Sequence, residues 1–263
     1  LAGLDGAQVC TVSTACSSAL NAIFLGARML ENGEADYVIA GGSEALSQFH
    51  LNGFNTLMIL DHERCRPFDA TRAGLNLGEG AAFLVMTRSD NARYAYVTGW
   101  GNRCDAYHQT ATSDDGLGAR LCMQDALDMA GLKPSDIPYV NAHATGTPNN
   151  DRSESQAIYG VFADAMPLVS GTKSLTGHTT SASGAIEAVL CLMAMKDRLA
   201  PAAMGVDTRD EACVPVLAEN TDVELRHVLC NSFGFGGNDS AMVLSAEPGP
   251  KKVTSVPEQG VRV

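Results

Sequence analysis

Apolar residues along the chain recur at two different spacings, and these predict alternating helices and strands. In the segment Ser17–Glu31 they return every three to four positions, the spacing of a helix with one buried face, at Leu20, Ile23, Phe24, Ala27 and Leu30. The pair Asn32-Gly33 then predicts the end of this helix. The same pattern predicts further helices over Gly118–Ala130, Asp151–Phe162 and Ser183–Lys196.

Short apolar runs bounded by glycine, proline or polar residues predict buried strands. These runs are Gln8–Thr14, Tyr37–Ala40, Gly80–Thr87, Tyr94–Trp100, Tyr139–Ala142, Pro167–Ser170, His227–Cys230 and Ser240–Ser245. Strands that alternate with helices favour an α/β fold with a mainly parallel sheet buried on both faces. The order strand–helix–strand occurs twice, before and after about residue 90, and a polar tail that we expect to be disordered begins at Glu247.

Composition and charge narrow the class of protein. The chain has 263 residues, 45% of them hydrophobic, and a net charge of −12. This charge argues against nucleic acid as a main partner, since phosphate binding needs a basic surface. The longest apolar runs are shorter than the roughly 20 residues that span a bilayer, so we expect no membrane span. No basic segment followed by an apolar run opens the sequence, so we expect a cytoplasmic location.

The cysteines do not predict a metal site or a disulfide framework. There are eight, none in a C-x-x-C pair, and they are Cys10, Cys16, Cys65, Cys104, Cys122, Cys191, Cys213 and Cys230. Zinc sites need clustered ligands, and disulfide frameworks belong to small secreted chains. We therefore expect reduced, buried cysteines and no bound metal.

One cysteine has a setting that suits a nucleophile. Cys16 lies between small and hydroxylated residues at the start of the helix predicted over Ser17–Glu31. Backbone N–H groups at a helix start favour an anion, which would lower the pKa of the thiol. A small residue that packs a strand–helix junction would explain Cys16 equally well.

Two histidines strengthen the case for a catalytic site. His143 follows the strand Tyr139–Ala142, and His178 follows the strand Pro167–Ser170, each in a segment rich in glycine and threonine. The carboxyl ends of parallel strands are where α/β proteins place ligands. Lys173 precedes His178, and Glu187 is the one acid in the apolar helix Ser183–Lys196. An unpaired buried charge is costly, so Lys173 is the expected partner of Glu187 unless Glu187 faces solvent.

A glycine-rich segment, "NSFGFGGNDS" from Asn231 to Ser240, connects the last two predicted strands. Such a loop can present backbone N–H groups to an oxyanion, or it can form a tight β-turn. No helix is predicted after it, so it is not a dinucleotide-binding motif.

Several segments together resemble the β-ketoacyl-[acyl-carrier-protein] synthases, condensing enzymes of the thiolase-like family. They are "TACSSA", "AGGSEA", "RPFDATRAGLNLGEGAAFLVM", "NAHATGTPNND", "GTKSLTGH" and "CNSFGFGGNDS", in the order and spacing of the family. The elongating, synthase II-like enzymes of fatty acid synthesis are the most similar type, because both basic positions are histidine. The resemblance implies a thiolase-like layered α-β-α-β-α fold.

The resemblance also implies a function, an acyltransferase that catalyses decarboxylative Claisen condensation. Cys16 would carry the acyl chain as a thioester, and His143 and His178 would stabilise the enolate formed from malonyl-acyl carrier protein. The backbone N–H groups of Cys16 and Phe235 would form the oxyanion hole. Further implied roles are orientation of the histidines by Lys173 and Glu187, contacts to the pantetheine arm by Thr145 and Thr147, and gating by Phe235 beside Phe233. The implied partner is acyl carrier protein, with no cofactor, and the family is usually homodimeric.

The chain also departs from the family pattern. It starts just before the nucleophile, so we expect the first half of the fold to be incomplete. Residues 1–90 would be the remainder of the N-terminal half, residues 91–246 the C-terminal half, and residues 247–263 the polar tail. Asp239 stands where an uncharged residue is more usual.

Other functions and roles stay open at this stage. A polyketide-type ketosynthase, an inactive fragment and a partner subunit of a condensing enzyme are alternatives, although partner subunits typically lack the cysteine. Arg64, Arg66 and Arg72 could dock the carrier protein, but we expect solvated surface roles for them.

Overall fold

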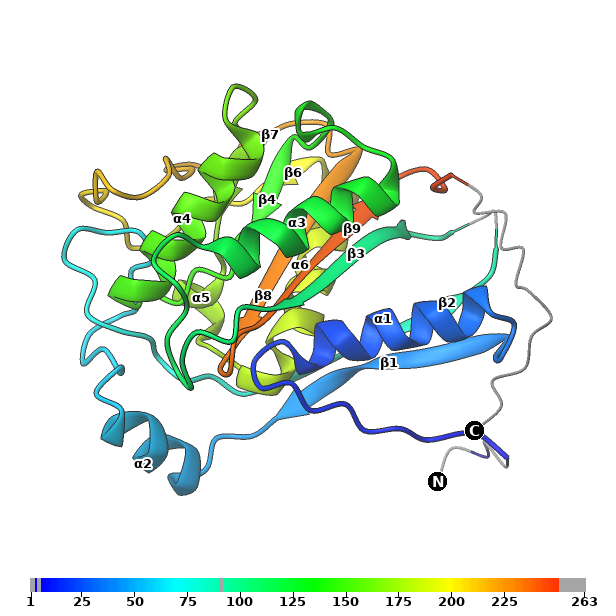
Figure 1. The fold of residues 1–263 in the computed structure, drawn as a ribbon, viewed down its shortest axis with the longest axis horizontal. Helices are drawn as coiled ribbons and strands as arrows, with labels where there is room; N and C mark the ends of the chain where they lie inside the picture. The colour runs from blue at the N-terminus through cyan, green and yellow to red at the C-terminus, as the bar shows by residue number, and fades with distance from the viewer. Residues whose placement is uncertain (1–2, 4–5, 90–91, 251–263) are drawn as a thin grey trace.

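A computed structural model describes residue 3 and residues 6–89 and 92–250 of the protein (Figure 1). A five-stranded sheet forms its centre, in the order β3 (Tyr96–Cys104), β9 (Asn238–Ser245), β8 (His227–Gly234), β4 (Tyr139–Asn141) and β5 (Leu168–Ser170). β3, β9 and β8 pair antiparallel, whereas β8, β4 and β5 pair parallel. Four strands therefore run in one direction, as expected of a mainly parallel sheet, and β9 alone is reversed, because the short glycine turn after Gly234 sends it back along β8.

Helices cover both faces of this sheet, and alternate residues of each strand pack on opposite sides. On β8, Leu229 joins the core with α3 (Leu117–Ala130) and α4 (Pro148–Phe162). Its neighbours Val228 and Cys230 join the core with α1 (Ser18–Glu31) and α6 (Ser183–Asp197). Because side chains alternate between the two faces of a strand, one continuous apolar strand contributes to both cores.

A second, two-stranded sheet lies on the other side of α1 and α6 (Figure 1). It consists of β1 (Tyr37–Glu44) and β2 (Gly80–Thr87), which pair antiparallel over eight residue pairs. The described residues thus form an α-β-α-β series of layers. Among them, no outer helix covers the far face of β1 and β2, where Tyr37, Ile39, Phe83 and Val85 are exposed.

The remaining elements connect these layers. They are α2 (Gln48–Thr56), α5 (Lys173–Thr176), the 3-10 turns η1 (Pro134–Asp136) and η2 (Thr180–Ala182), and the two-residue strands β6 (Leu199–Ala200) and β7 (Thr221–Asp222). The helix α2 has no buried residue, and in Figure 1 it lies at the edge of the molecule. Within residues 6–89 and 92–250, none of the helices has the length and apolar character needed to cross a bilayer.

The strand predicted over Gln8–Thr14 does not form. Only Thr14 makes an isolated bridge, and Val9 in the middle of the segment is 89% exposed. An extended apolar segment becomes a strand only when a neighbouring strand satisfies its backbone groups, and no described strand lies beside this one. Of the polar tail, residues 251–263 lie outside the described part of the chain.

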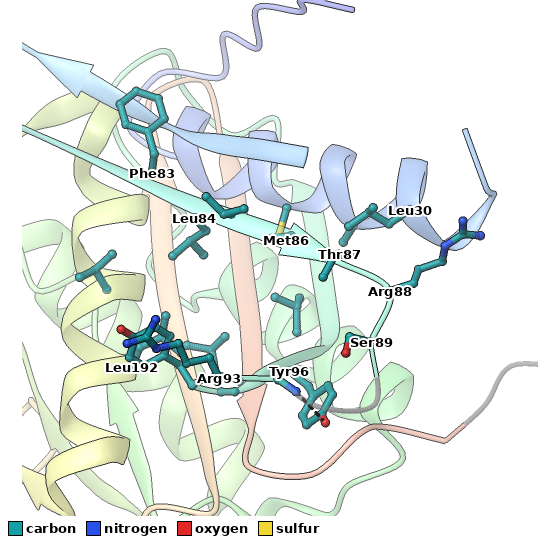
Figure 2. A pocket seen from close by; sticks show the side chains of 18 of the residues that line it. Leu30, Phe83, Leu84, Met86, Thr87, Arg88, Ser89, Arg93, Tyr96 and Leu192 are labelled. Carbon is teal, nitrogen blue, oxygen red and sulfur yellow. Dashed lines mark hydrogen bonds between the residues drawn. The ribbon is translucent and has the colours of Figure 1, made fainter. Parts of the chain in front are cut away.

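A cavity of about 840 Å³ lies along β2 (Figure 2). Leu84 and Met86 of β2, Leu30 of α1 and Leu192 of α6 contribute its apolar wall, and Tyr96 lies at the beginning of β3. None of the predicted site residues lines this cavity.

Candidate active site

Cys16 lies in a tight backbone turn before α1, and the hydroxyl groups of two serines hold this turn. Ser18 Oγ accepts the backbone N–H of Thr14 at 2.9 Å and donates to the Ala15 carbonyl at 2.6 Å. Ser17 Oγ donates to the Thr14 carbonyl at 2.8 Å. Ala15 has a φ of 52°, a left-handed conformation that a non-glycine residue rarely adopts. The serines of "TACSSA" therefore fix a strained turn that presents Cys16.

The end of β8 lies directly against this turn. Ser232 Oγ donates to the carbonyl of Cys16 at 3.0 Å. A Cβ on Gly234 would lie 2.6 Å from the Thr14 carbonyl oxygen and 3.1 Å from the Cys16 nitrogen, so this position requires glycine. The glycine-rich segment thus forms a tight turn and also brings β8 into contact with Cys16.

The thiol of Cys16 does not have the low pKa that its helix-start position predicts. Cys16 is only 5% exposed, and burial raises its pKa to about 11. The charge of Lys173 and hydrogen bonds from the backbone N–H groups of Phe235 and Cys16 oppose this effect. Both N–H groups that the resemblance assigns to an oxyanion hole therefore act on the thiol by lowering its pKa.

His143 is held by a lysine on one side and a glutamate on the other. Lys173 Nζ lies 3.2 Å from His143 Nδ1 and donates to the His143 carbonyl at 2.5 Å. Because an ammonium group can only donate, Nδ1 accepts and the ring proton of a neutral His143 lies on Nε2. Glu154 accepts the backbone N–H groups of His143 at 2.8 Å and Ala144 at 2.9 Å.

Lys173 also forms the predicted ion pair with Glu187, at 2.5 Å between Nζ and Oε1. Both side chains are buried, so the alternative that Glu187 faces solvent is wrong. Burial raises the pKa of Glu187, whereas the charge and hydrogen bond of Lys173 and a hydrogen bond from Ser183 lower it. The pair connects α6 to His143 through a single side chain.

His178 lies beside His143, with the two ring centroids 5.3 Å apart in an edge-to-face arrangement. Its backbone N–H donates to the Asn76 carbonyl at 2.7 Å, and its Nδ1 is buried without a hydrogen-bond partner among the described residues. Burial, followed by the charge of Lys173, lowers the pKa of both histidines well below the usual value. Both rings are therefore neutral at neutral pH and can donate hydrogen bonds without carrying charge.

A cavity of about 320 Å³ brings the predicted residues together. Its lining includes Cys16, His143, His178, Thr145, Thr147, Phe233 and Phe235. The two threonine hydroxyl groups lie 2.9 Å apart. The ring of Phe233 lies 5.6 Å from that of His143, and the ring of Phe235 stacks on Phe54 of α2 at 5.8 Å. No group of three or more potential metal ligands occurs in the described part of the chain.

Comparison with known proteins agrees with this arrangement. Residues 2–92 match the family model described as beta-ketoacyl synthase, N-terminal domain, and residues 94–207 match the model of its C-terminal domain. The chain belongs to the β-ketoacyl synthase family. Among curated relatives, 3-oxoacyl-[acyl-carrier-protein] synthase 2 of Vibrio cholerae is 36% identical over 92% of this chain, and that of Coxiella burnetii 38% identical over 89%. The chain spans 63% and 61% of the length of these two relatives.

Solved ketosynthases show the same thiolase-like fold. The ishigamide ketosynthase/chain length factor is 32% identical with a TM-score of 0.86. The match covers 91% of this chain and 61% of the solved chain. The ketosynthase ApeO of Xenorhabdus doucetiae, in complex with its chain length factor, is 38% identical with a TM-score of 0.85, over 90% of this chain and 59% of its own. The first half of the fold is incomplete in the described residues, as expected.

Some functional residues of this synthase-family chain were not predicted as such. Glu154 falls within the helix predicted over Asp151–Phe162, yet it is 1% exposed and accepts hydrogen bonds from the His143 backbone N–H and the Asn231 amide. Burial raises its pKa to about 7. A charged residue on the apolar side of a predicted helix was the available signal. Phe54 carried no such signal, because only the fold places it next to Phe235.

The expectation of a surface role is wrong for Arg72. Arg72 is 7% exposed, and its guanidinium lies 2.8 Å from Asp210 and 3.6 Å from the buried Asp151. Asp151 accepts the backbone N–H groups of Gly146 and Phe68. Arg72 therefore stabilises the loop that carries Thr145 and Thr147, while Arg64 stays exposed. Cys10 and Cys104 are also exposed, against the expectation of buried cysteines.

Proposed function

We propose that the protein to which this chain belongs catalyses the decarboxylative condensation of an acyl thioester with malonyl-acyl carrier protein. One observation carries the proposal: Cys16 lines the same cavity as His143 and His178, whose rings are neutral. Relatives named 3-oxoacyl-[acyl-carrier-protein] synthase 2 support fatty acid elongation as the pathway.

The first step of the proposed reaction is acyl transfer to Cys16. The sulfur forms a bond to the thioester carbonyl carbon, and the carrier thiol leaves with the proton that Cys16 gives up. The negative oxygen of the tetrahedral intermediate occupies the site between the N–H groups of Cys16 and Phe235. Loss of one such donor commonly costs about 3 kcal/mol of transition-state stabilisation.

The second step is condensation. The malonyl carboxylate leaves as CO₂, and its electron pair forms an enolate whose oxygen accepts hydrogen bonds from His143 and His178. The enolate carbon then attacks the Cys16 thioester, and the thiolate leaves and takes up a proton. Neutral histidines can serve in this step, because each neutral ring still carries one N–H that can donate to the enolate oxygen. Lys173 and Glu187 are positioning residues that set the tautomer of His143.

The carrier protein and several further features belong to the same proposal. A solved complex of a type II polyketide acyl-carrier protein with its ketosynthase, 28% identical to this chain with a TM-score of 0.87, supports acyl carrier protein as the partner. We also propose Thr145 and Thr147 as contacts to the pantetheine arm, and Phe233 and Phe235 as residues that shape the acyl cavity. A cytoplasmic location, a homodimer and a division near residue 90 complete the proposal, the last supported by family models that meet between residues 92 and 94.

Polyketide extension is the second candidate function. The type II polyketide ketosynthase solved with its acyl-carrier protein supports this candidate, because it shares the fold of this chain with a TM-score of 0.87 at 28% identity. Both functions use the same two steps at Cys16, and they differ in the acyl chain that the enzyme accepts.

The variant His178→Ala tests the roles of the histidines. We expect it to lose release of CO₂ from malonyl-acyl carrier protein by at least a hundredfold. Acylation of Cys16, read by mass spectrometry of the intact protein, should persist because the oxyanion hole is unchanged. Release of CO₂ at the parental rate would show that His178 does not stabilise the enolate.

A further inference from the structure

Asp239 is a buried carboxyl group in the wall of the catalytic cavity with no assigned role. It is the second residue of β9, lies opposite Phe233 of β8, and is 1% exposed. It lines the cavity together with Cys16 and His143. Its Oδ2 atom is buried and has no hydrogen-bond partner among the described residues.

Acidic and neutral groups surround Asp239. A Cβ on Gly118 of α3 would lie 2.1 Å from Asp239 Oδ2 and 2.9 Å from Asp105 Cβ, so the two acids meet at the start of α3. Glu154 of α4 and Cys122 of α3 also face Asp239. Its register partner on β3, Arg103, pairs instead with Asp125. Burial, Asp105 and Glu154 together raise the pKa of Asp239 to about 8.

Asp105 organises the segment that follows β3. Its carboxylate accepts the N–H groups of Tyr107 at 3.0 Å and Ser113 at 3.2 Å and the hydroxyl of Thr112 at 3.1 Å. The residues from Thr110 to Thr112 line the cavity. Two backbone hydrogen bonds, Asp105 N–H to Gly237 and Gly236 N–H to Gln109, join this segment to the turn after Phe235.

We propose that Asp239 is a positioning residue that holds a proton at neutral pH, and that this proton preserves the hydrogen bonds from residues 107–113 to Asp105. If both acids were ionised, two like charges would repel each other in a buried site without a cation between them. Asp105 would then move away from Asp239, and the segment from residue 105 to residue 113 would lose hydrogen bonds and become more mobile beside the cavity. The importance of this segment for acyl binding rests on the proposed function, whereas the proposal that Asp239 holds a proton does not.

Hydrogen exchange tests the proposal without any need for catalysis. The exchange of peptides covering residues 105–113 is measured by mass spectrometry at about pH 6 and about pH 9, with times scaled for base catalysis of exchange. The chain is compared with Asp239→Asn, which has the same shape but cannot ionise. At about pH 6 we expect equal exchange, and at about pH 9 we expect the unsubstituted chain to exchange about tenfold faster.

Two further variants control the result. Asp128→Asn removes an exposed carboxylate from α3 and should behave like the unsubstituted chain at both pH values. Asp105→Ala removes the acceptor itself and should raise exchange at both pH values without a pH-dependent step. Glu154 titrates in the same range and faces Asp239, so the comparison is repeated in chains that all carry Glu154→Gln, where the difference at about pH 9 should persist. Equal ratios of unsubstituted chain to Asp239→Asn at both pH values would overturn the proposal.

Urea unfolding gives an independent reading of the proton. A carboxyl whose pKa is raised in the folded state stabilises the fold below its unfolded pKa, and this contribution is lost as pH rises through the folded pKa. The urea midpoint of Asp239→Asn relative to the unsubstituted chain should therefore rise between about pH 5 and about pH 9. A difference in urea midpoint that stays constant with pH would show that Asp239 does not hold a proton. An absence of condensation activity would count against the proposed function alone.

Discussion

The two sheets of the molecule are built from similar strand pairs but differ in what covers them. β8 and β9 pair antiparallel over eight residue pairs, and so do β1 and β2. Every residue from Val228 to Phe233 is buried, whereas burial alternates along β2. In the sequence both pairs are apolar, yet only β8 and β9 lie between helices on both faces (Figure 1). The comparison shows that apolar strands predict a sheet but not how many layers cover it.

Function follows the same division. The five-stranded sheet carries His143 after β4 and the turn after β8 that reaches Cys16. The two-stranded sheet contributes support only, through Glu44 of β1, which accepts hydrogen bonds from Thr180 and Ser181 shortly after His178. We therefore expect substitutions to have large effects around the five-stranded sheet and small effects on the outer face of β1 and β2.

Replacing Lys173 by methionine should have the largest effect on stability. The substitution leaves Glu187 buried without a partner and removes the donor to His143. Removal of one member of a buried ion pair costs about 3–5 kcal/mol, less where the remaining carboxyl takes up a proton. Urea unfolding measures the loss, and Lys196→Met on the exposed end of α6 is the matched control. Equal midpoints for both variants would show that the ion pair does not stabilise the fold.

A matched pair of core and surface substitutions tests the comparison of the sheets directly. Leu229→Ala on β8 removes a fully buried side chain and should cost about 2–5 kcal/mol. Ile39→Ala on β1 removes a side chain that is 59% exposed and should cost well under about 1 kcal/mol. Thermal or urea unfolding measures both. Similar losses would mean that the outer face of β1 and β2 is covered in solution.

Acid should weaken the region around the histidines more than the rest of the molecule. Burial lowers the pKa of His143 and His178, so the unfolded chain binds protons below about pH 6.5 that the folded chain does not. Stability should therefore fall as pH drops below that value, by up to about 1.4 kcal/mol per pH unit for each histidine. His143→Asn should flatten this dependence between about pH 6.5 and about pH 5. An unchanged slope would show that His143 is protonated equally in the folded chain.

Much of the fold could be predicted from the sequence because it follows from local patterns. The predicted helix Ser183–Lys196 is observed as α6 over Ser183–Asp197, and the strand Gly80–Thr87 as β2 with the same bounds. The strand predicted over Gln8–Thr14 was wrong, because strand formation depends on a neighbouring strand, which the local spacing of apolar residues does not report. The reversed direction of β9 was not predicted, because the turn after Gly234, and not the strand itself, sets its pairing with β8.

The candidate site divides in the same way. The pairing of Lys173 with Glu187 follows from the cost of a buried charge, which the sequence exposes as one acid in an apolar helix. The high pKa of Cys16 could not be predicted, because the cost of burial exceeds the effect of the helix start and depends on the whole fold. The contacts of Glu154 and Phe54 join segments distant in sequence, and so they required the three-dimensional arrangement.

Formation of a 3-oxoacyl product at Cys16 tests the central claim most directly. The protein to which this chain belongs is incubated with an acyl-acyl carrier protein and malonyl-acyl carrier protein, and the carrier-bound products are measured by mass spectrometry beside the variant Cys16→Ala. The account predicts an acyl adduct on Cys16, then a product two carbons longer together with CO₂, and neither adduct nor product with the variant. Product formed by Cys16→Ala at the rate of the unsubstituted chain would contradict the account.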